Sequence, residues 1–144
     1  MIWLLRHGDA EDGSPDEQRR LTPKGERQAR VAGAALKGLG VEPSSCLSSP
    51  RVRAADTARK ACESLGADVE LVDELSGGSF DPEELAAGRD GDVILVGHEP
   101  DFSEAVQRMT GARIKLKKGG VAAVEDGLLH VVLRPKDLDA LAGG

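Results

Sequence analysis

Apolar and polar residues alternate along the chain in a pattern that predicts strands and helices in turn. Short apolar runs with the length of buried strands lie at residues 2–5, 46–48, 69–72 and 93–97. Helices are predicted at residues 23–38, 52–65, 82–88 and 102–110. In the first two of these helices the apolar residues recur every three to four positions. We therefore expect an α/β fold with a mostly parallel central sheet flanked by helices.

The C-terminal third departs from this alternation. Apolar stretches at 121–125 and 128–133 flank Asp126-Gly127, a pair typical of a two-residue type I′ hairpin turn. The sheet should therefore finish with an antiparallel hairpin. Beyond Lys136 the chain is rich in alanine and glycine, and we expect this tail to fray. With 144 residues, 40% of them apolar, residues 1–144 have the size of one domain around one core.

The charge balance argues against two classes of partner. The net charge is −6, so the surface as a whole repels nucleic acid and anionic membranes. The apolar run before Arg6 is too short for a signal peptide, and we expect a cytoplasmic protein. Cys46 and Cys62 form no CxxC pair, so small buried thiols are expected rather than a disulfide.

Candidate chemistry begins where the first predicted strand ends. Arg6 and His7 follow the apolar run, and Gly8 lets the backbone turn and a ligand approach. In α/β sheets, ligands bind at the carboxyl ends of the parallel strands. An arginine beside a histidine at that edge indicates an anion held against a nucleophile.

Two more segments bring donors to the same edge. One strand passes through Ser48-Ser49-Pro50 into a helix whose first turn carries Arg53, while Arg51 is expected to be solvated. Another strand ends in a glycine followed by His98, so His98 has the same relation to its strand as His7 has to the first. A phosphoryl group in transfer spreads charge over three oxygens and needs donors from several directions. The combination therefore predicts a phosphoryl-transfer site.

These motifs, in this order, resemble the histidine phosphatase superfamily and, within it, the small phosphohistidine phosphatases of the SixA type. The matching segments are Arg6-His7-Gly8-Asp9-Ala10, Leu21-Thr22-Pro23-Lys24-Gly25, Ser49-Pro50-Arg51-Val52-Arg53-Ala54 and Gly97-His98. The resemblance implies a phosphoglycerate mutase-like fold. Aspartate after the Arg-His-Gly triplet favours the phosphohistidine branch over the mutase-like branches, where Glu or Gln commonly follows the glycine.

The resemblance also implies residue roles. His7 would be the nucleophile that becomes phosphorylated, and Arg6, Arg53 and His98 would clamp the phosphoryl oxygens. No metal or cofactor is implied. Asp56 stands where the family often has glutamine, which affects contacts of that side chain but not the role expected of Arg53.

The acid and the rim of the site are less strongly determined. Glu74, after the strand at 69–72, would lie near the leaving group, with Asp9 as the competing acid. Gly8 and Glu99 complete the expected substrate-binding set. The family usually carries a small or amide residue where Glu99 stands. A carboxylate beside a phosphate would repel it, so the side chain of Glu99 is expected to point outward.

Simpler interpretations of these residues stay open. His7 and His98 could be structural histidines or metal ligands. The remaining histidine, His130, falls in a predicted strand and the cysteines are poorly placed, which argues against a metal. Arg6 and Arg53 could be surface charges or ion-pair partners of nearby aspartates, although their place beside strand ends favours anion binding.

We therefore expect a metal-independent phosphatase that removes phosphate from phosphohistidine on a protein, such as a phosphotransfer domain, through a phospho-His7 intermediate. Imidazole protonates near pH 6.5 and leaves with little assistance, whereas an alcohol requires a well-placed acid. The short stretch between Glu74 and Val93 leaves little material for a lid, so the site should accept a protein side chain. A small-molecule phosphomonoesterase and a phosphate-binding module with little turnover remain alternatives, and a mutase is disfavoured.

Overall fold

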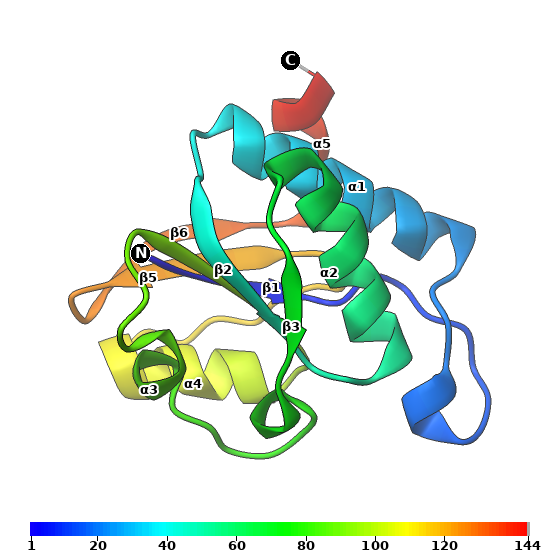
Figure 1. Cartoon of the computed structure of the whole chain (residues 1–144), viewed down its shortest axis with the longest axis horizontal. Helices are drawn as coiled ribbons and strands as arrows, with labels where there is room; N and C mark the ends of the chain where they lie inside the picture. The colour runs from blue at the N-terminus through cyan, green and yellow to red at the C-terminus, as the bar shows by residue number, and fades with distance from the viewer. Residues whose placement is uncertain (144) are drawn as a thin grey trace.

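The centre of the molecule is a six-stranded sheet, and the computed structural model describes residues 1–143 (Figure 1). In spatial order the strands are β3 (Val69–Leu71), β2 (Pro43–Ser48), β4 (Asp92–Gly97), β1 (Ile2–Arg6), β5 (Val121–Glu125) and β6 (Leu128–Leu133). The first four are parallel, and β5 and β6 form an antiparallel hairpin beside β1. The expected mostly parallel α/β sheet with a C-terminal hairpin is therefore confirmed.

Helices cover both faces of this sheet (Figure 1). One face carries α1 (Pro23–Gly38), α2 (Val52–Leu65) and α5 (Pro135–Gly143). The other face carries α3 (Pro82–Ala86) and α4 (Asp101–Thr110). Two short 3-10 helices, η1 (Asp16–Gln18) and η2 (Asp73–Leu75), lie in the loops that follow β1 and β3.

Strand β1 contributes to both cores because its side chains alternate between the faces of the sheet. Trp3 and Leu5 pack beneath α1, α2 and α5, whereas Leu4 packs on the side of α3 and α4. Leu4 and Leu5 are completely buried. The uninterrupted apolar run at the start of the chain is thus that of a strand buried on both faces.

The backbone after β1 packs directly against the start of α1. Thr22 caps this helix by accepting a hydrogen bond from the backbone N–H of Gly25 at 3.0 Å. A Cβ at Gly25 would lie 1.9 Å from the carbonyl oxygen of Asp9, and a Cβ at Gly8 would lie 2.6 Å from that of Gly25. Because only glycine fits at these two positions, the loop that carries His7 is held tightly against α1.

The C-terminal tail is helical through Gly143, so the prediction that it frays after Lys136 was wrong for the described residues. At the start of α5, the backbone N–H of Arg134 donates to the carboxylate of Asp137 at 2.8 Å. Leu138 is buried in the core shared with α1 and α2. Burial of a leucine side chain contributes roughly 1.5–3 kcal/mol, which tertiary packing supplies and local composition does not reveal.

The cysteines lie where the sequence placed them, although β2 is longer than predicted. Cys46 in β2 and Cys62 in α2 are buried free thiols. Strand β2 begins at Pro43 instead of residue 46, with a register irregularity between Pro43 and Ser45. Across residues 1–143, no helix is both long and apolar enough to cross a membrane.

Candidate active site

The carboxyl ends of parallel strands deliver the central residues of the site. Arg6 pairs with Gly97 across β1 and β4, so the residues that follow them, His7 and His98, emerge side by side. The ring centroids of the two histidines are 5.2 Å apart and their planes are inclined by 58°. Arg53 reaches the same place from the first turn of α2.

His7 is oriented by the backbone of its neighbour. Its Nδ1 lies 2.7 Å from the carbonyl oxygen of Gly8. A carbonyl can only accept, so Nδ1 carries the proton and Nε2 keeps a free lone pair. The Nε–H of Arg53 donates weakly to that Nε2 at 3.4 Å. The reactive nitrogen therefore points at a guanidinium, where a bound anion would lie.

His7 is neutral near pH 7. Burial is the main cause that lowers the pKa of His7 to about 4, and the nearby positive charges of Arg53, Arg6 and Lys118 lower it further, whereas the hydrogen bond to Gly8 opposes them. A neutral imidazole with one fixed proton and one free lone pair is the form that a nucleophile requires.

His98 is also buried and neutral. Burial, followed by the charges of the neighbouring side chains, lowers the pKa of His98 to about 3. Its Nε2 lies 2.8 Å from the hydroxyl oxygen of Ser49, and that oxygen accepts a hydrogen bond from the backbone N–H of Arg51 at 3.2 Å. The other ring nitrogen, Nδ1, is buried and has no partner among the described residues.

Arg6 carries the second unsatisfied nitrogen of the site. Its Nη1 donates to the carbonyl of Leu116 at 2.9 Å, but its Nε is buried without a partner among the described residues. Buried polar atoms are normally hydrogen-bonded, and exceptions call for an explanation. Arg6 precedes His7 in the chain, and His98 lies beside His7 across the sheet. Unsatisfied nitrogens on both neighbours of the nucleophile are expected of groups that bind an anion.

Asp16 enters the site from η1, a contact that the sequence did not indicate. Its backbone carbonyl and its carboxylate accept from Arg53 at 2.9 and 3.1 Å. The same carboxylate pairs with Arg51, whose Nε donates to the carbonyl of Ser76 at 2.6 Å. Arg51 is therefore partly exposed but held by protein contacts, instead of being freely solvated as expected. Hydrogen bonds from Arg19 and from Arg53 lower the pKa of Asp16.

Thr57 joins α2 to the nucleophile loop. Its hydroxyl accepts from the backbone N–H of Gly8 at 3.1 Å and donates to the carbonyl of Arg53, one turn earlier, at 2.7 Å. Because Gly8 also holds Nδ1 of His7, this single hydroxyl couples the position of the nucleophile to that of Arg53.

Known proteins resemble this chain in sequence and fold. A model of the histidine phosphatase superfamily, branch 1, matches residues 2–86, which include His7 and Arg53. The chain belongs to this superfamily. Membership in the histidine phosphatase superfamily supports phosphatase activity for the site.

Three similar proteins illustrate the relationship. An uncharacterised protein of Picosynechococcus sp. is 32% identical over 90% of this chain and 87% of its own length. Phosphohistidine phosphatase SixA of Escherichia coli is 36% identical over 52% of this chain and 48% of its own. A solved structure of the protein histidine phosphatase SixA complexed with tungstate has a TM-score of 0.82 and 25% identity, covering 95% of this chain and 98% of that one. The expected phosphoglycerate mutase-like fold is confirmed.

Glu99 was expected to point outward, but its carboxylate turns toward α4. Its Oε1 accepts from the backbone N–H of Ser103 in the first turn of α4 at 2.8 Å, and its Oε2 accepts from the Ser103 hydroxyl and from the backbone N–H of Leu116 at 3.3 Å. The prediction considered only repulsion by phosphate, whereas free N–H groups at a helix start attract a carboxylate. Glu99 thus holds the backbone of Leu116, whose carbonyl oxygen accepts the hydrogen bond from Arg6.

The two candidate acids differ in their surroundings. Glu74 is exposed on η2 and makes no hydrogen bond or ion pair with His7 or His98 within residues 1–143. Asp9 accepts from Thr22 at 2.8 Å and pairs with Lys118 at 3.4 Å, so it is engaged at the start of α1. The choice of general acid stays a prediction.

The residues that sequence reasoning missed are Asp16, Ser49 and Thr57. Thr57 lies one helical turn after Arg53, and Ser49 stands in a matched motif, so spacing offered a signal for both. Asp16 lies in a polar loop without periodicity, so no pattern in the sequence indicated its contact with Arg53. Asp56 pairs with Arg59 on the surface of α2 at 3.4 Å. Across residues 1–143, no cluster of His, Cys, Asp and Glu has the arrangement of a metal site.

Proposed function

We propose that this protein hydrolyses phosphohistidine on a partner protein through a covalent phospho-His7 intermediate. The observation that carries the proposal is the unprotonated Nε2 of His7, held by the bond from Nδ1 to Gly8 and facing Arg53. The names of the SixA relatives support the choice of phosphohistidine. The substrate would thus be a protein that carries phosphate on a histidine nitrogen.

In the first step, Nε2 of His7 attacks phosphorus in line with the leaving nitrogen. A P–N bond to Nε2 of His7 forms and the P–N bond to the substrate breaks. The substrate imidazole, which has taken a proton from water on its other nitrogen beforehand, leaves as the neutral ring, and phospho-His7 keeps its own proton on Nδ1. Arg6, Arg53 and His98 donate to the three equatorial oxygens, where charge accumulates. Removing one such donor costs about 10²–10³-fold in rate in comparable sites.

In the second step, water attacks phosphorus of phospho-His7. The P–N bond to His7 breaks and phosphate leaves as the dihydrogen anion with both protons of the water. His7 recovers the lone pair on Nε2, with Nδ1–H still donating to Gly8. Fixed guanidinium and imidazole N–H groups supply the charge stabilisation that a divalent cation supplies elsewhere. We therefore propose a metal-independent reaction.

The chemistry of the leaving group favours phosphohistidine over a phosphate ester. Neither Glu74 nor Asp9 is held against the histidine pair, and imidazole needs little acid assistance because it protonates near pH 6.5. We also propose a cytoplasmic setting in histidine-based signalling, which the buried free thiols support, since free cysteines are typical of reducing compartments.

The test compares a histidine-phosphorylated protein with a panel of alkyl and aryl phosphate esters, in the presence of a chelator. We expect preferential release of phosphate from phosphohistidine, and mass analysis after a neutral-pH quench should find phosphate on His7. His7→Ala should be inactive, with Arg30→Ala on the exposed face of α1 as the matched control. Phosphate on another residue, or a preference for a small ester, would overturn the proposal.

A further inference from the structure

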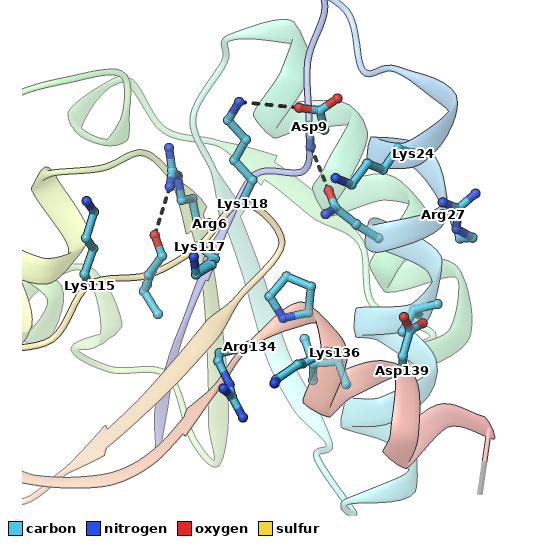
Figure 2. A pocket seen from close by; sticks show the side chains of 15 residues that line it. Arg6, Asp9, Lys24, Arg27, Lys115, Lys117, Lys118, Arg134, Lys136 and Asp139 are labelled. Atoms are coloured by element: carbon cyan, nitrogen blue, oxygen red, sulfur yellow. Dashed lines mark hydrogen bonds and ion pairs between the residues drawn. The ribbon is translucent and has the colours of Figure 1, made fainter.

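A basic groove, which Figure 2 shows from close by, shares Arg6 with the active site. It has a volume of about 910 Å³ and is built from segments far apart in the chain. Helix α1 contributes Lys24 and Arg27, the loop 115–118 contributes its three lysines, and the start of α5 contributes Arg134 and Lys136. We use the name basic groove for this hollow.

The charge of the basic groove is opposite to that of the whole chain. Eight of the 19 lysines and arginines line the groove when Arg6 is included. Only two acidic side chains, those of Asp9 and Asp139, are among its lining residues. The chain as a whole has a net charge of −6. Positive charge concentrated on one face of an acidic protein creates a local field that attracts an anionic partner to that face.

Most of these cations are available to a partner. Lys118 pairs with Asp9 at 3.4 Å and Arg134 with Asp137 at 2.9 Å. Within residues 1–143, no carboxylate lies within ion-pair distance of the remaining exposed cations of the basic groove, which are Lys24, Arg27, Lys115, Lys117 and Lys136.

The basic groove is continuous with the candidate active site through Arg6. Arg6 lines the groove and its Nη1 donates to the carbonyl of Leu116 (Figure 2). The charge of Arg6 also contributes to lowering the pKa of His7. Just after the lysines, the backbone N–H of Gly119 donates to the carbonyl of His7 at 3.0 Å. A substrate with its phosphoryl group at His7 would therefore lay its neighbouring surface along the groove.

From this geometry we infer that the basic groove docks a carboxylate-rich polypeptide surface that flanks the phosphohistidine of the substrate. The inference rests on the proposed function, because it names the partner of the same site. The substrate protein would thus be selected by α1, the loop 115–118 and α5, whereas Arg6, Arg53 and His98 hold the phosphoryl group.

The composition of the groove favours a polypeptide over a phosphate backbone. Apart from Arg6, which belongs to the active site, its unpaired cations are four lysines and Arg27, so outside the active site it offers one free arginine fork to hold phosphate through paired hydrogen bonds. Its lining includes the half-buried apolar side chain of Val31, which a polypeptide can cover. Asp139 on its wall would repel a continuous polyanion, whereas a protein surface can place a basic residue there.

The test uses two histidine-phosphorylated peptides of equal length, one with glutamates and one with glutamines around the phosphohistidine, together with free phosphohistidine. The groove variant is Arg27→Glu with Lys136→Glu. Its matched control is Arg30→Glu with Lys60→Glu, which changes the net charge equally but lies outside the groove and has its first substitution on the same helix. Thermal unfolding establishes that both variants fold.

We expect the groove variant to lose at least about tenfold in kcat/KM on the glutamate peptide, mainly through KM and most strongly at low salt. It should act on free phosphohistidine as well as the wild type does, and the control variant should match the wild type on every substrate. Equal losses in the two variants, or no preference of the wild type for glutamate over glutamine, would overturn the inference.

A binding experiment separates this inference from the proposed function. An unphosphorylated, fluorescent glutamate-rich peptide should bind the wild type and the control variant but not the groove variant, even if phosphohistidine proves not to be the substrate. Inorganic polyphosphate and an oligothymidylate of equal charge are the competitors. If either binds more tightly than the peptide, the groove serves a phosphate backbone and the inference fails.

Discussion

Asp16 and Arg53 form an ion pair of 3.1 Å, and a second hydrogen bond of 2.9 Å joins Arg53 to the carbonyl of the same aspartate. The loop after the nucleophile strand is thereby tied to the first turn of α2. The carboxylate of Asp16 also contacts Arg51. It thus occupies guanidinium donors that a phosphoryl group would use, and it offsets the positive charge around His7 and His98.

Asp16→Asn should strengthen the binding of phosphate severalfold, because the neutral amide no longer competes with an anion for Arg53. Product inhibition by phosphate measures this effect, and tungstate provides a second oxyanion. Asp56→Asn, which removes a carboxylate from the outer surface of α2, is the control and should leave inhibition unchanged. Weaker phosphate binding in Asp16→Asn would show that Asp16 positions Arg53 instead of competing with the substrate.

The activity should persist well below neutral pH. The pKa of His7 is lowered to about 4, so its lone pair remains free until the pH approaches that value. We expect kcat/KM for an acid-stable substrate such as an aryl phosphate to stay level from pH 7 to about 5 and to fall below it. An acid limb near pH 6.5, the ordinary pKa of histidine, would contradict a buried neutral nucleophile.

The free energy of unfolding should also depend on the protonation of His7 and His98, and it should decrease at acid pH. The pKa values of His7 and His98 are lowered to about 4 and about 3, whereas in the unfolded chain both protonate near 6.5. Between these values the unfolded state binds more protons, so the free energy of unfolding decreases as the pH falls through this window. Urea unfolding at pH 7 and pH 4.5 measures the decrease. It should shrink in His98→Asn, which removes one of the two groups.

Ser49→Ala should disturb the protonation pattern of His98. In the wild type we expect the Ser49 hydroxyl to donate to Nε2 of His98, which leaves the proton on the unpartnered Nδ1, where it can donate to a phosphoryl oxygen. Nitrogen NMR should show the Nδ1–H tautomer in the wild type and a mixture in the variant, together with about a tenfold loss in kcat. Wild-type spectra that show Nε2–H would refute this role.

Glu74→Gln tests whether the exposed carboxylate on η2 assists the leaving group. Only an alkoxide requires a proton in the transition state, so hydrolysis of alkyl phosphates should fall much further than hydrolysis of phosphohistidine. Glu70→Gln, on the neighbouring strand β3 and also exposed, is the matched control. Equal and severe losses on both substrates would favour the phosphomonoesterase alternative.

The sequence was sufficient to predict the six strands and the helices α1 to α4 in their order, but not α5. Both long helices have the predicted bounds, 23–38 and 52–65, because their apolar periodicity and the cap at Thr22 are local signals. The sequence also predicted that His7 and His98 each follow the end of a strand. Parallel strands align their carboxyl ends, so local order along the chain was enough to predict that the two histidines meet.

Contacts between distant segments were decided only by the tertiary structure. The pairing of Asp16 with Arg53, the turn of Glu99 toward α4 and the burial of Leu138 each join residues whose surroundings come from other parts of the chain. The basic groove likewise exists only because α1, the loop 115–118 and α5 converge in space. Periodicity reports which side of an element is buried, whereas the partner of a side chain depends on how the elements pack, and no local pattern encodes that.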